Sequence, residues 1–360
     1  MNVAVRVDAS TEIGLGHVRR CLSLGQALQA DGADVHFVTR NLGVDVVGPV
    51  TTAGFRCSLL RAPRAEERDG LAHEPMHAGW AQVSAHVDAE ETALALAQFG
   101  ADWLVVDHYA FDARWHEAIS GRGAIRVAVV DDLADRPLAA DLLIDHNFAP
   151  DHRAKYAGRL DPAVPILGGP RFALLDASYE TAARYAFQEV VRSIGIFMGG
   201  ADVADVSRTV LLACREHVRF DGAIEIATTR QNPHHRALIA LAETWPHTTV
   251  TLDQPDLAAF FGRHDLQVGA GGGATWERCC IGAPTQVLVV ADNQRHVIEP
   301  LVELGILHAV LHAPHSPASV GVELDRMIKD VGLRRRGAEK GRALVDGQGT
   351  RRVAHAMRTG

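Results

Sequence analysis

The sequence predicts an α/β protein built from two Rossmann-like domains, each with a parallel sheet. Short runs rich in Val, Ile and Leu alternate with longer segments of helical spacing along most of the chain. This alternation restarts after Pro162 and Pro165. The length of 360 residues also favours about two domains. Repeated strand–helix units of this kind form parallel sheets that are covered by helices.

The first half of the chain contains five short, apolar runs flanked by turn or charged residues. Such runs are typical of parallel strands buried on both faces. We expect these strands at Val3–Val7, Val35–Thr39, Trp103–Asp107, Arg126–Val130 and Leu142–Asp145. Helices are expected between them at His17–Ala30, Val83–Phe99 and Ala113–Ser120.

The second half repeats the pattern. Its expected strands are Ser193–Phe197, Ala223–Ala227, Thr249–Leu252, Leu266–Val268 and Gln286–Val290. Its expected helices are Val203–His217, His234–Glu243, Thr275–Ile281 and Arg295–Leu304. The segment 147–170, rich in proline and glycine, is the expected boundary. We therefore predict domains at 1–165 and 166–335, followed by closing helices over 336–360.

Composition restricts the classes of partner and compartment. The net charge of −8 argues against a general nucleic-acid binder, because phosphate backbones are bound by clustered Lys and Arg. The five cysteines form no C-x-x-C pair, as in cytoplasmic proteins with reduced thiols. No secretory signal pattern and no apolar run of ~20 residues is present, so we expect no membrane insertion.

The first glycine-rich turn, Asp8-Ala-Ser-Thr-Glu-Ile-Gly14-Leu-Gly16-His17, lies between an expected strand and an expected helix. A dinucleotide site would need G-x-G-x-x-G, but Arg19 replaces the third glycine. Arg40 at the end of the next strand keeps NADP as a weaker alternative. A simple tight turn with a surface histidine is another. We favour His17 as a base, because an ordinary imidazole pKa of ~6.5 suits proton abstraction near neutrality.

Two further glycine-rich turns, at 198–203 and 269–275, also precede expected helices. Backbone N–H groups at a helix N-terminus bind anions, so the two turns together could hold a diphosphate without a metal. Glu277 could accept hydrogen bonds from ribose, or could be an ordinary solvated carboxylate. The chain contains no D-x-D triplet. We therefore expect neither a metal nor a cofactor.

Polar loops follow two more of the expected strands. Asp107-His108-Tyr109 should open at the same sheet edge as His17, because both loops end parallel strands. Tyr109 could instead be an amphipathic aromatic cap. The loop Ala291-Asp-Asn-Gln294 could contact a sugar or diphosphate, or could cap a helix through Asp292 or Asn293.

These motifs, in this order, resemble the UDP-sugar hydrolases of pseudaminic acid biosynthesis (PseG), which are relatives of GT-B glycosyltransferases. The resemblance covers about residues 1–310 and rests on DASTEIGLGHVRR, VVDHY, FMGGAD, GAGGGATWE and ADNQ. It implies two Rossmann-like domains that face each other across a cleft. It also implies metal-free hydrolysis of UDP-2,4-diacetamido-2,4,6-trideoxy-β-L-altropyranose to UDP and free sugar, in a pathway that supplies flagellin or surface glycans.

The resemblance also implies roles for particular residues. His17 would be the general base and Tyr109 an active-site residue beside the sugar. The implied substrate contacts are Asp8, Gly14, Gly16, Arg20, Asn293 and Gln294. The implied UDP contacts are Gly199, Gly200, Gly271, Gly272, Gly273 and Glu277.

Some features depart from the family. Asp176 stands where the family usually has Arg, and the segment 61–79 matches no family feature. A related enzyme for another UDP-diacetamido sugar is therefore an alternative. A GT-B glycosyltransferase with a sugar or lipid acceptor and a non-catalytic nucleotide-sugar-binding protein are others. The sequence predicts no particular protein partner.

The expected reaction needs only one proton-transferring group. Most glycosidases use two carboxylates, because one of them must protonate a poor leaving group. A diphosphate spreads its own charge, and preorganised N–H groups stabilise that charge as it develops. We therefore expect water activated by His17 to attack the anomeric carbon, with C–O cleavage and inversion.

Overall fold

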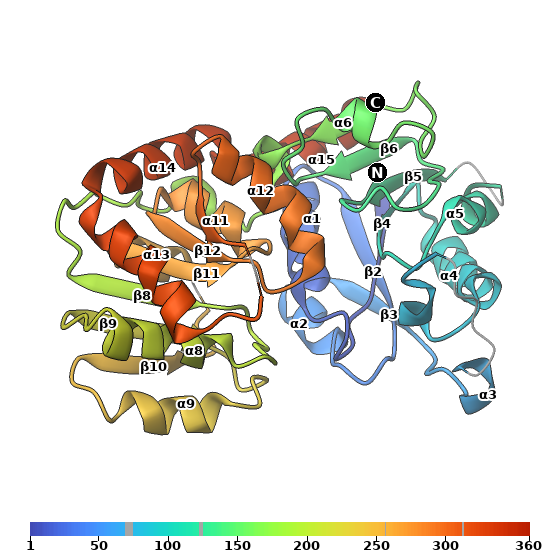
Figure 1. The fold of residues 1–360 in the computed structure, drawn as a ribbon. Helices are drawn as coiled ribbons and strands as arrows, with labels where there is room; N and C mark the ends of the chain where they lie inside the picture. The colour runs from blue at the N-terminus through green and yellow to red at the C-terminus, as the bar shows by residue number, and fades with distance from the viewer. Residues whose placement is uncertain (69–74, 122–124, 256, 312) are drawn as a thin grey trace. The chain divides into compact units, whose positions relative to one another are not determined.

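The computed structural model describes residues 1–68, 75–121, 125–255, 257–311 and 313–360. The chain packs into two compact units, one of residues 1–177 with 348–360 and one of residues 178–347. Figure 1 labels their elements. Each unit contains one parallel sheet with helices on both faces, and each is described by itself below.

The first unit contains a seven-stranded parallel sheet in the order β3-β2-β1-β4-β5-β6-β7. Its strands are β1 (Asn2–Val7), β2 (Asp34–Arg40), β3 (Arg56–Leu60), β4 (Trp103–Asp107), β5 (Arg126–Val130), β6 (Leu142–Asp145) and β7 (Ile166–Gly168). The five expected strands are confirmed. The sequence did not predict β3 and β7, which are short edge strands without a continuous buried run.

Seven helices belong to the first unit among the described residues. They are α1 (Gly16–Ala30), α2 (Val47–Thr52), α3 (Ala65–Arg68), α4 (Ala85–Phe99), α5 (Ala113–Ser120), α6 (His152–Lys155) and α15 (Gly349–Thr359). Short 3-10 turns lie at Ala78–Ala81 and Pro170–Phe172. Ser84 caps α4 by accepting the Val87 N–H, and Asp112 caps α5 in the same way.

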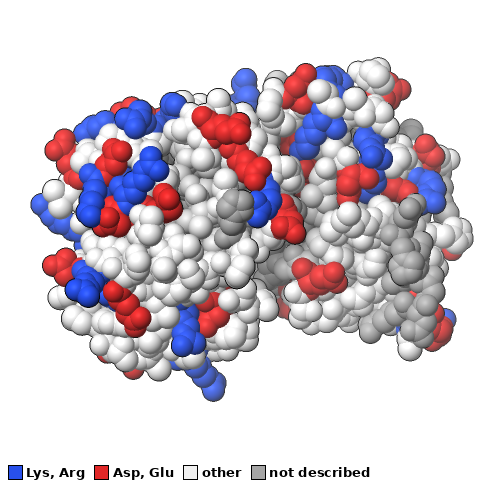
Figure 2. All heavy atoms as spheres, viewed as in Figure 1, with Lys and Arg blue, Asp and Glu red and all other residues white. Residues whose placement is uncertain are grey.

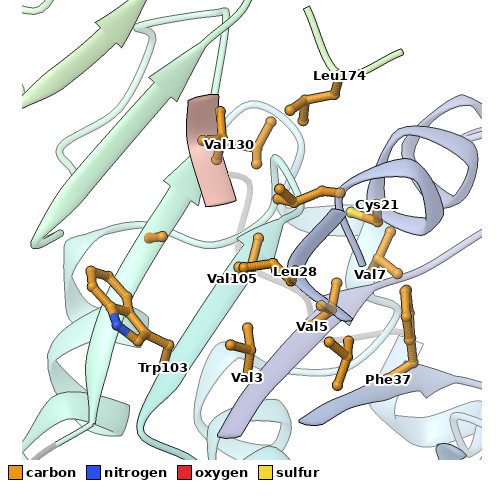
Figure 3. Close-up of a cluster of buried hydrophobic side chains, with 14 of the residues drawn as sticks. Val3, Val5, Val7, Cys21, Leu28, Phe37, Trp103, Val105, Val130 and Leu174 are labelled. Carbon is orange, nitrogen blue, oxygen red and sulfur yellow. The ribbon is translucent and has the colours of Figure 1, made fainter. Parts of the chain in front are cut away.

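The alternation of side chains along β1 separates two cores. Val3, Val5 and Val7 pack with α1 and α2 on one face of the sheet, as Figure 3 shows for part of this cluster. Ala4 packs on the other face, in the core that includes residues of α4 and α5. Helix α15 adds its own side chains to the first of these cores, so residues 348–360 complete the unit that begins at β1.

The second unit contains a six-stranded parallel sheet in the order β10-β9-β8-β11-β12-β13. Its strands are β8 (Ser193–Phe197), β9 (Ala223–Thr228), β10 (Thr248–Leu252), β11 (Leu266–Ala270), β12 (Thr285–Leu288) and β13 (His308–Val310). The five expected strands are confirmed. The three-residue β13 was not predicted, because it is too short to give a periodic signal.

Helices of the second unit cover both faces of its sheet. They are α7 (Ser178–Thr181), α8 (Val206–Leu212), α9 (His235–Ala242), α10 (Leu257–Gly262), α11 (Ala274–Ile281), α12 (Arg295–Glu303), α13 (Pro317–Lys329) and α14 (Val331–Leu344). Helix α8 continues into a π-helical turn at Ala213–His217. A 3-10 turn at Asp292–Gln294 precedes α12.

The limits of the two units differ from the expected domain limits of 165 and 335. Strand β7 pairs with β6, so residues 166–168 lie in the first sheet. Helix α14 extends across position 335 and belongs to the second unit, whereas α15 belongs to the first. Proline and glycine content indicates where loops lie, but it does not show which sheet an edge strand joins.

Charged side chains are mixed on the surface. On the face in Figure 2, basic and acidic residues alternate over short distances, so this face has no long basic stripe. None of the helices in the described residues is long and apolar enough to span a bilayer.

Candidate active site

Buried acidic side chains gather at the carboxyl ends of the first sheet. Asp107 ends β4, Asp145 ends β6, and Asp131 and Asp132 directly follow β5. The loop that leads from β1 into α1 opens at the same edge, because Val7 pairs with Asp107. In parallel α/β sheets, ligands bind just beyond the carboxyl ends of the strands. The sheet register therefore places the loops of His17 and Tyr109 at the same edge, as the sequence predicted.

His17 lies at the first turn of α1 with its ring against Asp107. The His17 Nδ1 atom is 2.6 Å from Oδ1 of Asp107, whose side chain is fully buried. The His17 side chain is 11% exposed. The Arg20 Nη2 atom also lies 3.0 Å from His17 Nδ1, but it donates to Oδ1 of Asp107 over 2.5 Å. When Asp107 accepts the Nδ1 proton, Nε2 of the neutral ring is unprotonated and can accept a proton.

Arg20 holds the carboxylate that orients His17. It donates from Nε to Oδ2 of Asp107 over 2.6 Å and from Nη2 to Oδ1 over 2.5 Å. Burial by itself would raise the pKa of Asp107, but the charges of Arg20 and then His17 outweigh it and hold that pKa well below its usual range. Asp107 is therefore ionised at neutral pH. The expected contact of Arg20 with substrate stays a prediction, since its guanidinium already binds Asp107.

The Tyr109 ring packs against the His17 ring. The two ring centroids are 4.9 Å apart with the planes nearly perpendicular. The Tyr109 hydroxyl donates to Oδ1 of Asp132, and Asn147 donates from Nδ2 to the other oxygen over 2.6 Å. Burial and then the charge of Asp132 raise the pKa of Tyr109 well above its usual value, so the phenol keeps its proton. Tyr109 is thus fixed as a hydrogen-bond donor toward Asp132.

Sequence reasoning missed several members of this cluster. Asp132 follows β5, and His146 and Asn147 follow β6, so the rule of strand ends that selected Tyr109 would also have found them. The His146 Nε2 atom lies 3.4 Å from Nη1 of Arg20. Burial and then the charge of Arg20 lower the pKa of His146 to about 4. Lys155 donates to the Asp132 carbonyl and to Asp145, each over 2.7 Å.

Gly14 and Gly16 shape the loop in front of His17. Gly14 has a φ of 73° and donates its N–H to the Ser10 carbonyl over 2.9 Å. A positive φ is adopted by glycine without strain, so the tight turn requires glycine at this position. Gly16 is the first residue of α1. Their contacts with substrate stay predictions.

Asp8 is not where the sequence placed it. Its side chain is fully buried, and it accepts hydrogen bonds from Arg6 Nη2 over 2.8 Å and from the Arg40 backbone N–H over 2.7 Å. The expectation that Asp8 contacts substrate is therefore corrected: its carboxylate is consumed by a buried network. Arg40, the basis of the weaker NADP alternative, is also buried, and its guanidinium pairs with Asp88 and Glu91.

In the second unit, the turn after β8 does not leave a free helix end. Gly199 has a φ of 91°, as a tight glycine turn requires. Asp202 accepts the N–H groups of Val206 and Ser207, each over 2.9 Å, at the start of α8. An anion at this helix would have to compete with that carboxylate. The expected contacts of Gly199 and Gly200 with UDP stay predictions. They do not involve the N–H groups of Val206 and Ser207.

The turn after β11 is different, because the N-cap residue of α11 is Gly273, which has no side chain. A Cβ atom built on Gly272 or Gly273 meets no other atom within 4 Å, so this part of the loop faces open space. Gly271 packs instead against Gln294 and Ile298. The N–H groups of Thr275 and Trp276 donate to the Gly272 and Gly273 carbonyls, so the amides of Gly272 and Gly273 are the candidates for binding a diphosphate.

Two other residues that we expect to bind ligand already accept hydrogen bonds within the second unit. Gln294 accepts the Val290 N–H through Oε1 over 3.0 Å, so its amide oxygen supports the loop. Glu277, in the first turn of α11, accepts the Tyr179 hydroxyl over 2.6 Å. The side chain of Asn293 lies outside the described residues. Contacts of these three residues with ligand stay predictions.

Within the described ranges, no three His, Cys, Asp or Glu side chains group so that they could hold a metal ion. The acidic groups at the sheet edge are instead paired with Arg20, Lys155 and Arg136. The first unit therefore offers a proton acceptor, His17, and an ionised carboxylate, Asp107, that orients it.

Comparison with known proteins gives one curated relative and many solved structures. No protein-family model matches the sequence. The spore coat polysaccharide biosynthesis protein SpsG of Bacillus subtilis (strain 168) is 26% identical over 191 residues, which are 52% of this chain and 56% of that protein. The chain thus spans little more than half the length of this relative.

Solved structures match over nearly the whole chain. MurG of Acinetobacter baumannii has a TM-score of 0.67 at 14% identity and covers 100% of this chain and 99% of its own. The glycotransferase of kitacinnamycin has a TM-score of 0.69 at 15% identity, covering 99% and 98%. The S. aureus MnaA–UDP co-structure has a TM-score of 0.63 at 12% identity, covering 99% and 96%. The predicted α/β fold is confirmed as the GT-B fold of glycosyltransferases.

Proposed function

We propose that this protein hydrolyses a UDP-linked diacetamido-trideoxy sugar to UDP and the free sugar, in the cytoplasm and as a step of nonulosonic (pseudaminic) acid biosynthesis. The proposed substrate is UDP-2,4-diacetamido-2,4,6-trideoxy-β-L-altropyranose. The observation that carries the proposal is the contact of His17 with buried Asp107, which leaves Nε2 as a proton acceptor. The likeness to a polysaccharide biosynthesis protein supports the choice of glycan metabolism.

In the proposed reaction, His17 Nε2 takes a proton from water while the water oxygen attacks the anomeric carbon. The bond between that carbon and the diphosphate oxygen breaks, and its electron pair leaves with UDP. Asp107, ionised and held by Arg20, stabilises the imidazolium that forms. Tyr109 fixes the ring from the side and faces the sugar.

UDP is proposed to bind at the turn 271–273, through the amides of Gly272 and Gly273 that precede α11. Such amides stabilise negative charge on the leaving diphosphate without a metal. The S. aureus MnaA structure is a co-structure with UDP, and this likeness supports a uridine nucleotide as the ligand class.

A glycosyltransferase is the second candidate, and the solved structures favour it, since MurG and the kitacinnamycin enzyme share the fold. The same base would then deprotonate a sugar or lipid hydroxyl in place of water. The two functions differ only in the acceptor.

One experiment separates the two functions. Purified protein is incubated with a panel of UDP-sugars in EDTA, with and without sugar or lipid acceptors, and UDP release is followed. NMR of the product gives the anomeric configuration. Release without acceptor, with inversion, supports the hydrolase. Release only after an acceptor is added supports the transferase, and loss of activity in EDTA contradicts a metal-free reaction.

A further inference from the structure

Two aromatic rings from outside the family motifs lie against His17 and Tyr109. They come from the 3-10 turn Ala78–Ala81 and the residue before it. The Trp80 ring centroid is 6.1 Å from that of His17 and 5.5 Å from that of Tyr109. The His77 ring is 4.6 Å from Trp80 and 5.7 Å from Tyr109. The proposed base is therefore bordered by the Trp80 and Tyr109 rings, and His77 packs on both of these.

This aromatic wall, defined as His77, Trp80 and Tyr109, is anchored on both sides. The Trp80 indole donates from Nε1 to Oε1 of Glu12 over 2.9 Å, which ties it to the loop in front of His17. After it, the buried residues Ala81 and Val83 fix the chain to the body of the first unit. Trp80 is therefore held at the base and is not a loosely attached surface ring.

The chemistry of the wall is aromatic and uncharged. Burial lowers the pKa of His77, so its imidazole is neutral at neutral pH. Aromatic faces bind C–H groups and methyl groups well. They offer no partner to a hydroxyl, and a hydroxyl that loses water without a new hydrogen bond costs free energy. Charged groups next to the wall include Glu12, hydrogen-bonded to the Trp80 indole, and Arg136, 5.6 Å from the Tyr109 ring centroid.

We propose that Trp80 and His77 form a sugar subsite that selects N-acetylated 6-deoxy pyranoses over sugars with a 6-hydroxyl. The methyl groups of the deoxy carbon and of the acetamido substituent would pack on the wall, with the anomeric carbon toward His17. This inference rests on the proposed function, because it assumes a nucleotide sugar as the substrate. It assigns a role to His77, within the segment 61–79 that the sequence left unassigned, and to Trp80, which directly follows that segment.

The kinetic test compares UDP-2,4-diacetamido-2,4,6-trideoxy-β-L-altropyranose with UDP-2,4-diacetamido-2,4-dideoxy-β-L-altropyranose, the same sugar with a 6-hydroxyl. Wild type is expected to prefer the 6-deoxy substrate in kcat/KM. Trp80→Ala should reduce that preference about tenfold, mainly through KM, whereas Trp80→Phe should keep most of it. An unchanged preference in Trp80→Ala, with an unchanged circular dichroism spectrum and Tm, overturns the proposal. His77→Ala supplies a second variant if Trp80→Ala does not fold.

A binding test separates this inference from the proposed function. Free 2,4-diacetamido-2,4,6-trideoxy-L-altropyranose is titrated while tryptophan fluorescence is recorded, with 2,4-diacetamido-2,4-dideoxy-L-altropyranose, which keeps the 6-hydroxyl, as the comparison. The 6-deoxy sugar should change the fluorescence of wild type and of Trp245→Phe, the matched control in the second unit, but not of Trp80→Phe. This result with no turnover of any UDP-sugar would reject the proposed function alone. A response that persists in Trp80→Phe, or is equal for both sugars, rejects the subsite.

Discussion

The Nδ1 atom of His17 lies 2.6 Å from Oδ1 of Asp107, and both oxygens of that carboxylate also receive hydrogen bonds from Arg20. One buried carboxylate thus orients the imidazole while a neighbouring cation balances its charge. The contact spans two strands, because β1 leads into the helix of His17 and β4 ends at Asp107. The adjacency of these two strands in the sheet determines the geometry of the proposed base.

Replacing His17 tests the base itself. His17→Ala should lower kcat by about 10²–10⁴-fold, the usual contribution of a general base. UDP affinity, measured by calorimetry, should change by less than about threefold, because UDP is proposed to bind in the second unit. His86→Ala, at a side chain that is 75% exposed, is the matched control. An equal loss of UDP affinity would mean that His17 binds the nucleotide.

Replacing Asp107 tests the orientation of the base. Asp107→Asn keeps the shape but removes the charge that pairs with Arg20 and stabilises the imidazolium. We expect kcat to fall by about 10²–10⁴-fold with little change in UDP affinity. The measurement is a rate profile from pH 5 to 9 on folded protein. Full activity in Asp107→Asn would exclude this carboxylate from the reaction.

Because His116 is buried, we expect the folded protein to lose stability in mild acid. Burial and then the charge of Arg136 lower the pKa of His116 to about 3 in the folded protein, against an ordinary value of about 6.5. Between these two values the unfolded chain binds a proton that the folded chain does not. The free energy of unfolding therefore falls as pH drops from about 6.5 toward 3 and is unaffected above neutrality.

The test of that pH dependence is urea unfolding at pH 7 and pH 5. His116→Gln should show a smaller difference between the two pH values than wild type does. His86→Gln, whose ring is exposed, should behave like wild type. If His116→Gln loses stability with falling pH as steeply as wild type, another group is responsible.

Gly269 in β11 is expected to tolerate no side chain. A Cβ atom there would lie 2.2 Å from Nη1 of Arg278 and 2.9 Å from the Phe197 carbonyl oxygen. Arg278 is itself buried, which lowers its pKa to about 10, so it cannot easily move aside. Gly269→Ala should reduce the free energy of unfolding by about 1–3 kcal/mol in urea titrations. Equal stability of Gly269→Ala and wild type would contradict this packing.

The turn at Gly272 gives a test of nucleotide binding with an internal control. Gly272→Asp adds a negative charge beside the start of α11 and should weaken UDP binding at least about tenfold. Gly272→Ala adds only a methyl group into open space and should leave the affinity within about threefold. Calorimetry with UDP measures both. Equal affinity in the two variants would place the diphosphate elsewhere.

In the sequence, the ends of the predicted strands indicated which residues form the candidate site. His17 and Tyr109 follow β1 and β4, which are neighbours, and parallel pairing brings their loops together. Asp132 and Asn147 follow the next two strands, so the same signal extends to them although the sequence prediction did not include them. The edge strands β3, β7 and β13 gave no signal, since each is short and at most partly buried.

Other features depended on contacts that local sequence does not encode. Asp8 was assigned to substrate, although Arg6 stands two residues before it on the same face of β1 and pairs with it. Trp80 reaches His17 from a segment more than 60 positions away, and no periodicity indicates that contact. Asp202 caps α8 within its own turn, so a glycine-rich loop before a helix need not leave its amides free.

Helix α15 has a consequence for how the protein is made. Val353, Ala354 and Met357 belong to the same core cluster as Val18, Cys21 and Leu24 of α1. The polypeptide that completes this core is synthesised only after the whole second unit, residues 178–347. The apolar side of the helix that carries His17 therefore lacks part of its cover throughout the synthesis of the second unit.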